Sequence, residues 1–156
     1  MARLLAAQVR ERYLDPSGWQ VFDDVHLALA ALTQAGWSHV VLSNHVPELP
    51  ALMDTLGLAH HFQGIISSAS SGYEKPHPQA FAAALRRVPA GQRCVMVGDS
   101  LVADVLGARA AGLEAMWVRG RDDGEERNYA DLTMLVAHLA QSGLIENFNK
   151  RRGHST

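Results

Sequence analysis

Apolar and polar positions along this chain follow two alternating patterns. Short apolar runs that each end in polar residues predict buried strands, over residues 39–44, 62–67, 93–99 and 114–120. Apolar residues at helical spacing predict helices, over residues 1–14, 25–35, 47–56, 78–87, 101–111 and 131–141. Strand and helix alternate four times, so we predict an α/β fold: a three-layer, Rossmann-like parallel sheet with right-handed crossovers.

Residues with helix-end preferences support these boundaries. Asp23 or Asp24 is placed to cap the helix that follows, and Gly36 is placed to end it. Pro78 is a good first residue for its helix. The turn chemistry of residues 15–18 separates the first predicted helix from the alternating part of the chain.

Composition narrows the class of protein. The 156 residues suffice for one domain, and a net charge of −2 argues against a nucleic-acid-binding module. A single cysteine excludes an internal disulfide scaffold. No apolar run approaches the roughly 20 residues that span a bilayer, and the start of the chain does not resemble a signal peptide. We expect a soluble cytoplasmic protein that is not bound to a membrane.

In folds of this class, ligands bind at the carboxyl ends of the strands. Asp99 directly follows one predicted strand, and Asp104 falls in the first turns of the next helix. Two carboxylates there suit a hard cation such as Mg²⁺. Alternatively, Asp99 caps the helix and Asp104 is an acid favoured by the helix dipole. Taken alone, this segment leaves both interpretations open.

Two further polar segments follow other strands. Lys75 lies between a polar loop and Pro76, which limits the backbone, so its ammonium could be a fixed charge for a phosphoryl oxygen. Ser43 and Asn44 end the first predicted strand and could hold an anion. A solvated lysine and a simple Ser/Asn turn are the alternatives. The eight histidines look scattered, and His60, His61 and His39 lack metal-ligand spacing with a carboxylate.

Taken together, these segments resemble the haloacid dehalogenase (HAD) superfamily, in the branch whose members are mostly Mg²⁺-dependent phosphatases. The resemblance covers roughly residues 19–119. It rests on a VxSN segment, a GxxxxFxxIxxS stretch, a KPxPxxF block and a GDSxxxDxxGAxxAG run, which place Ser43, Gly57, Phe62, Ile65, Ser68, Lys75, Pro76, Pro78, Phe81, Asp99, Asp104, Gly107, Ala108 and Gly112.

The resemblance implies a role for each matching residue. Ser43, helped by the adjacent Asn44 amide, would bind the transferring phosphoryl group. Lys75 would neutralise the charge on the nucleophile and on the phosphoryl oxygens. Asp99 would be a ligand of Mg²⁺, and Asp104 would orient Lys75 or support the water shell of the metal. The implied reaction is hydrolysis of a small phosphomonoester through an aspartyl-phosphate.

The nucleophile that the family requires is missing from the sequence. It would be the first aspartate of a DxDxT segment on the first, central strand, and none of the aspartates of this chain matches that pattern. The resemblance places that strand between the strands that contain Leu42 and Val95. We therefore expect an incomplete sheet, with residues 1–18 as a remnant of a cap-domain helix and linker, 19–145 as a partial core, and 146–156 as a flexible tail.

The missing strand leaves several functions open. We expect Mg²⁺ to bind weakly or not at all, and the chain alone to be inactive, unless a complementing chain or an exchanged segment in a homo-oligomer fills the gap. A catalytically dead HAD-like module for binding or assembly is the alternative. A receiver-like phosphoacceptor fits less well, since its acid pair would also lie on the first strand.

Overall fold

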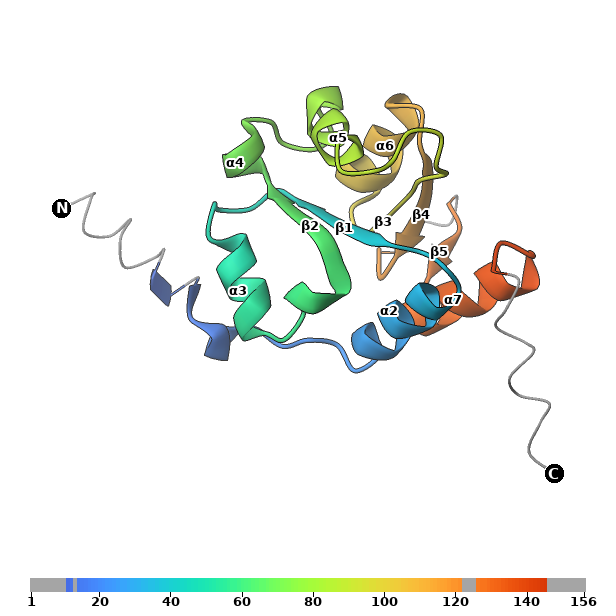
Figure 1. Ribbon diagram of the computed structural model, residues 1–156, viewed down its shortest axis with the longest axis horizontal. Helices are drawn as coiled ribbons and strands as arrows, with labels where there is room; N and C mark the ends of the chain where they lie inside the picture. Colours follow the sequence, from blue (N-terminus) through green and yellow to red (C-terminus); the bar gives the residue numbers. More distant parts are fainter. Residues whose placement is uncertain (1–10, 13, 122–125, 146–156) are drawn as a thin grey trace.

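Parallel strands with helices on both faces form the architecture in the computed structural model (Figure 1), which describes residues 11–12, 14–121 and 126–145. Figure 1 shows α4, α5 and α6 on one face of the strands and α2, α3 and α7 on the other. The layers are the three that the sequence predicts, so the predicted α/β class is confirmed. No helix among the described residues is both long and apolar enough to cross a membrane.

The described strands form two separate parallel sheets. The first pairs β1 (His39–Ser43) with β2 (Phe62–Ser67). The second has the order β3-β4-β5, with β3 at Val95–Gly98, β4 at Glu114–Val118 and β5 at Asn128–Tyr129. The four predicted strands are confirmed, and β5 was missed. Two residues are too few for a sequence pattern, and Asn128 is held there through its side chain, which bonds the backbone of Gly120 at 2.6 and 3.1 Å.

Helices connect the strands at nearly the predicted places. The α-helices are α2 (Val25–Gln34), α3 (Leu49–Thr55), α4 (Ser68–Ser71), α5 (Pro78–Leu85), α6 (Gly107–Ala110) and α7 (Leu132–Gln141). Short 3₁₀ turns lie at η1 (Pro16–Gly18) and η2 (Ala59–His61), and a π-helix, η3, covers Leu101–Leu106. Gly36 follows α2 with a positive φ of 91°, which confirms the predicted end of that helix.

Two local predictions need correction. The single helix expected over residues 101–111 is divided into η3 and α6, because the Val105 amide reaches back to the carbonyl of Ser100. Asp24 stands at the cap position of α2, but its side chain does not cap that helix. Its carboxylate instead pairs with Arg119 and accepts a 2.7 Å hydrogen bond from the amide of Leu132, so it joins α2 to β4 and α7.

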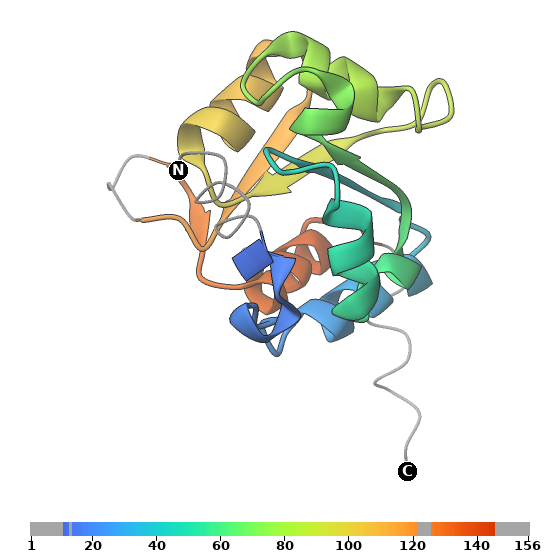
Figure 2. The same ribbon diagram turned by 90° about the vertical axis from the view of Figure 1, so that its left-hand side faces the viewer.

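A cluster of buried side chains lies around α7. Leu135, at 1% exposure, packs with Val136 and Leu139 of α7, with Val118 and Tyr129 of the second sheet, and with Ala28 of α2. This core therefore holds α2 and α7 against the second sheet, and Figure 2 shows these two helices side by side below the strands.

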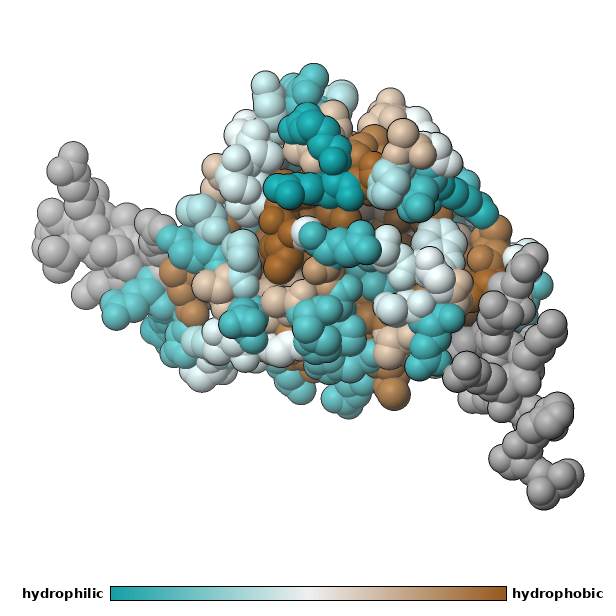
Figure 3. Space-filling model, viewed as in Figure 1, coloured by the Kyte–Doolittle hydropathy of each residue, from teal (hydrophilic) through white to brown (hydrophobic). Residues whose placement is uncertain are grey.

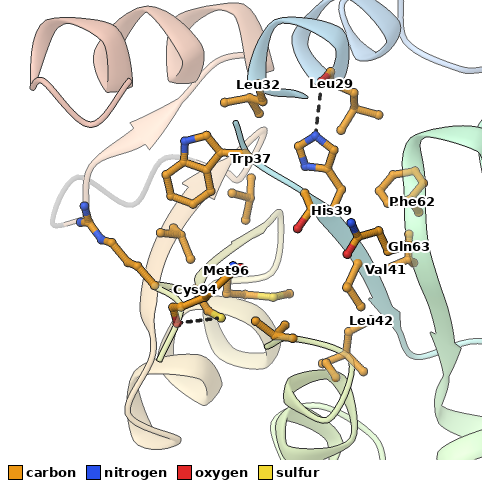
Figure 4. Close-up of a pocket in the computed structure, with 18 of the residues that line it drawn as sticks. Leu29, Leu32, Trp37, His39, Val41, Leu42, Phe62, Gln63, Cys94 and Met96 are labelled. Carbon is orange, nitrogen blue, oxygen red and sulfur yellow. Dashed lines mark hydrogen bonds between the residues drawn. The ribbon is translucent and has the colours of Figure 1, made fainter. Parts of the chain in front are cut away.

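A groove separates the two sheets. The described strands β1 and β3 are not hydrogen-bonded to each other, and both line an apolar groove of about 680 Å³. Figure 4 shows Leu42 of β1, Met96 of β3 and Leu32 of α2 around the groove. Figure 3, in the same view as Figure 1, shows apolar side chains exposed in the middle of the molecule. No residue of β1 or β3 is fully buried, and Val97 is 37% exposed, although inner parallel strands are normally covered on both faces. The open position is where the family resemblance places the strand that this sequence lacks.

The two predicted end segments are described only in part. Residues 1–10 and 13 of the expected helix and linker lie outside the described residues, as do residues 146–156 of the expected tail. Trp19, just beyond the first segment, packs its ring 5.8 Å from that of His45.

Candidate active site

A buried ion pair joins Lys75 and Asp104 at the carboxyl ends of the strands. The Lys75 ammonium donates to Asp104 Oδ1 at 2.6 Å, and the two side chains are only 10% and 5% exposed. The residues are 29 positions apart in sequence, one on the loop before α5 and the other in η3. The interpretation of Lys75 as a solvated lysine is therefore wrong. Asp104 does lie in the first turn of η3, but its carboxylate also pairs with Lys75. The pairing with Asp104 holds the positive charge of the Lys75 ammonium at a fixed position.

Asn44 fixes the backbone at Lys75. Its side-chain oxygen accepts a hydrogen bond from the Lys75 amide at 2.7 Å, and its side-chain nitrogen donates to the Lys75 carbonyl at 2.9 Å. Lys75 is followed by a cis peptide bond to Pro76. The side chain of Asn44 is thus occupied in positioning Lys75, a task that sequence reasoning did not assign to it.

Asp104 is held from its other side by the turn that follows β3. Its Oδ2 accepts a 3.0 Å hydrogen bond from the amide of Ser100, so both carboxylate oxygens have partners. Gly98 makes this approach possible: a Cβ atom there would lie 2.2 Å from Asp104 Oδ2. The glycine before Asp99 is required for the packing of Asp104 as well as for the turn.

The carboxylate of Asp99 remains available. Ser100, and not Asp99, caps η3, since its hydroxyl accepts from the Ala103 amide at 3.1 Å. Asp99 is exposed, and its backbone carbonyl accepts a 2.9 Å hydrogen bond from the indole of Trp117. The turn is thereby anchored to β4, while no ion pair occupies the Asp99 carboxylate among the described residues.

Ser43 and Asn44 lie at the carboxyl end of β1, beside the same loop. Ser43 is opposite Ser67 in the sheet register and is half-buried. Ser68 braces the next residue, because its hydroxyl accepts from the amide of His45 at 3.1 Å and lies 3.3 Å from the carbonyl of His45. A chain of contacts therefore runs from the end of β1 through Asn44 and Lys75 to Asp104 and the turn after β3.

Sequence reasoning assigned no supporting role to three residues of the site: Ser68, Ser100 and Trp117. Ser68 and Ser100 stand next to predicted strand ends, where a hydroxyl is a common cap or brace, so the position of each was a usable signal. Trp117 carries no such signal, because its bond to Asp99 depends on the pairing of β3 with β4.

The described residues do not make a complete Mg²⁺ site. Mg²⁺ prefers six oxygen ligands in octahedral geometry and usually takes one or two carboxylates with water and phosphate oxygens. Both oxygens of Asp104 are already hydrogen-bonded, so Asp99 is the carboxylate of the GDSxxxD run that is left for a metal. A tight site would need a further acidic ligand next to Asp99.

Comparison with known proteins agrees with this geometry. The sequence matches the family described as haloacid dehalogenase-like hydrolase over residues 2–112, which include β1 to β3 and the predicted site residues from Ser43 to Asp104. The chain belongs to this hydrolase family.

Relatives of this HAD-like hydrolase include phosphatases. It is 32% identical to haloacid dehalogenase-like hydrolase domain-containing protein 3 of Danio rerio, over 97% of this chain and 61% of the relative. It is 38% identical to a phosphoserine phosphatase of Thermus thermophilus, over 75% of this chain and 47% of the relative. The crystal structure of a HAD phosphatase from Thermococcus onnurineus superposes with a TM-score of 0.71 at 27% identity, over 85% of this chain and 63% of the other. The chain thus spans about half to three fifths of the relatives that it matches.

Proposed function

We propose that this chain carries the phosphoryl-binding part of a phosphatase that hydrolyses small phosphomonoesters through an aspartyl-phosphate. The observation that carries the proposal is the buried Lys75–Asp104 pair, held by Asn44 and Ser100 at the carboxyl ends of the strands. A fixed ammonium stabilises charge on a transferring phosphoryl group without having to reorganise during the reaction. The relatives named as phosphatases support the same reaction class.

In this proposal each residue has one task. Lys75 neutralises charge on the nucleophile and the phosphoryl oxygens, and Asp104 keeps its ammonium in place. The hydroxyl of Ser43 donates a hydrogen bond to a phosphoryl oxygen. Since the Asn44 side chain is bonded to Lys75, the backbone amide of Asn44 is the group left to assist Ser43. Asp99 supplies an acidic ligand to Mg²⁺.

The nucleophile comes from a strand outside this sequence. The groove between β1 and β3 is the place for it, because its lining is apolar and both flanking strands run parallel within their own sheets. A strand inserted there would have its backbone groups paired on both sides. It would come from another segment of a longer protein, from a second chain, or from a twin chain in an oligomer. Mg²⁺ binds weakly until that strand adds its carboxylate to Asp99.

Complementation tests the proposal. We expect no Mg²⁺-dependent turnover of p-nitrophenyl phosphate by the 156-residue chain alone. We expect turnover when it is co-expressed with a segment bearing DxDxT. Asp99→Asn and Lys75→Ala should each abolish that turnover. Activity of the chain alone that disappears in Asp99→Asn would contradict the need for a second segment.

A matched pair of valines tests whether the groove receives the strand. Val97 lines the groove, whereas Val102, at 63% exposure, lies on η3 and outside it. Val97→Asp should block complementation because it places a carboxylate where an apolar strand must pack. Val102→Asp should not. A folded complex of the two segments without turnover would favour the alternative of an inactive binding module.

A further inference from the structure

Three histidines that are separated in the sequence meet at the edge of the sheet opposite the candidate active site. His26 lies in the first turn of α2, and His60 and His61 end the η2 turn that leads into β2. His26 Nδ1 lies 3.0 Å from His61 Nε2, and the rings of His60 and His61 have centroids 4.0 Å apart. The expectation that these histidines are merely scattered is wrong, because the fold brings His26 to the other two.

The donor atoms of this trio are grouped closely enough to share one ion. One nitrogen from each ring lies within 4.8 Å of the other two. Tetrahedral zinc, with Zn–N bonds of about 2.0–2.1 Å, needs its nitrogens about 3.4 Å apart. His26 and His60 are exposed, so small ring rotations can close the remaining gap without disturbing the core.

The surroundings of His61 favour its neutral imidazole, which is the form that binds metals. Burial, followed by the neighbouring His60, His26 and His39, lowers the pKa of His61. His39 is a different case: its Nε2 is occupied by the Thr33 hydroxyl at 3.1 Å and the Leu29 carbonyl at 3.3 Å.

We propose that His26, His60 and His61 bind one divalent transition-metal ion, best matched by zinc. Three imidazoles without a carboxylate suit a borderline ion such as Zn²⁺ better than Mg²⁺ or Ca²⁺. A water molecule would take the fourth position, as in sites with three protein ligands. This site lies at the amino-terminal end of β2 and is separate from Asp99 and Lys75, which lie at the carboxyl ends.

The location gives the ion a structural task. α2 packs with α7 in the core of the second sheet, whereas η2 leads directly into β2 of the first sheet. An ion held by His26, His60 and His61 would therefore join the two halves of the molecule on either side of the groove. α2 itself lines that groove through Leu29 and Leu32. Zinc would hold α2, and with it one wall of the groove, in place.

Calorimetric titration of the untagged, metal-free chain with Zn²⁺ tests the proposal. We expect one Zn²⁺ per chain and a higher midpoint of thermal unfolding in its presence. Cobalt should bind at the same site and give the visible absorption of a tetrahedral complex. Losing a hydrogen-bond partner of a metal ligand costs about 10–100-fold in affinity, so His60→Ala and His26→Ala should each weaken binding at least about tenfold.

Control variants make the outcome decisive. His60 is exposed, so His60→Ala should keep its fold, which circular dichroism can check. His77→Gln alters an exposed histidine at the amino-terminal end of α5, and this variant should bind Zn²⁺ as the unaltered chain does. Equal affinity in the unaltered chain and in a folded His26→Ala/His60→Ala double variant would overturn the proposal. A stoichiometry of one Zn²⁺ per two chains would also overturn it, since it would show a site between chains.

Discussion

The candidate active site and the apolar groove differ in whether their groups have partners within this chain. At the site, Lys75 and Asp104 are bonded to each other, and Asn44 and Ser100 satisfy the groups beside them. In the groove, β1 and β3 leave an edge each without a strand partner among the described residues, and Val97 is 37% exposed. The polar part of the site is preorganised by this chain alone, whereas the described strands leave the sheet open between β1 and β3.

The difference shows which parts of the fold depend on local contacts. Asp104, Ser100 and Gly98 lie within seven residues of one another, so their arrangement needs only the turn after β3. The groove, in contrast, depends on what lies between two strands more than fifty residues apart in sequence. Supplying the missing strand should therefore change the groove much more than the site.

The largest expected effect is that of Asp104→Ala. It leaves the Lys75 ammonium buried without its partner, and breaking a buried pair in this way costs about 3–5 kcal/mol of stability. Asp99→Asn is the matched control from the same motif: Asp99 is exposed, and the change should stay within about 0.5 kcal/mol. Urea unfolding of both variants measures the difference. Equal destabilisation would mean that the pair is not a structural part of the site.

A pair of leucines compares the packed part of the molecule with the groove. Leu52 of α3 is 5% exposed, so Leu52→Ala should cost about 2–5 kcal/mol. Leu42 is half-buried and faces the groove, so Leu42→Ala should cost clearly less, because it removes fewer contacts (Figure 4). When the groove is filled by a complementing strand, the two costs should approach each other. The same cost for both in the chain alone would indicate that the groove is closed in solution.

Gly98→Ala should have a smaller but definite effect. The added methyl would overlap the carboxylate of Asp104, and overpacking of this kind costs about 1–3 kcal/mol. Gly18→Ala is the control, because a Cβ atom there meets nothing within 4 Å. Thermal unfolding of the two variants measures the contrast. Tolerance of Gly98→Ala with full stability would show that Asp104 has room to move away from the turn.

The smallest expected effect is a pH dependence from His39, at the start of β1. Burial lowers the pKa of His39 below its usual value of 6.5, so the unfolded chain takes up its proton first as the pH falls. The free energy of unfolding should therefore decrease as the pH drops below about 6.5. Urea unfolding at several pH values, with EDTA to exclude metals, should show this decrease and a smaller one in His39→Gln. A stability that rises on acidification would contradict the sign.

A strand bound in the groove should increase the pH dependence that His39 contributes to the free energy of unfolding. His39 is among the residues that line the groove, and Figure 4 shows its bond to the carbonyl of Leu29. Deeper burial would lower the pKa of His39 further and make the pH dependence steeper.

Much of the fold could be predicted because its signals are local. The runs that became β1 and β2 are apolar and end in polar residues, and Gly36 and Gly57 end helices with positive φ. The two residues of β5 carry no such pattern, and the π-helix depends on a shift of one residue in hydrogen bonding that propensity does not report. Boundaries were correspondingly less accurate: the strand expected over 93–99 covers Val95–Gly98.

In the candidate site, the residues could be predicted from the sequence, but their contacts could not. Residue type and position after a strand identified Ser43, Lys75, Asp99 and Asp104 as candidates, and their proposed roles await the experiments above. The contact between Lys75 and Asp104 spans 29 residues, and the bonds between Asn44 and Lys75 span 31. Such partners are chosen by the packing of loops from different strands, so no local pattern reveals them.

The sequence by itself determined the α/β alternation, the family resemblance and the absence of a DxDxT segment, because these depend on residue types at short spacing. Tertiary structure alone decided that Asp104 holds Lys75 and leaves Asp99 available, that the sheet opens between β1 and β3, and that His26 meets His60 and His61. The physical reason is common to all three: each depends on atoms far apart along the chain, whose distances are set when helices and sheets pack against one another.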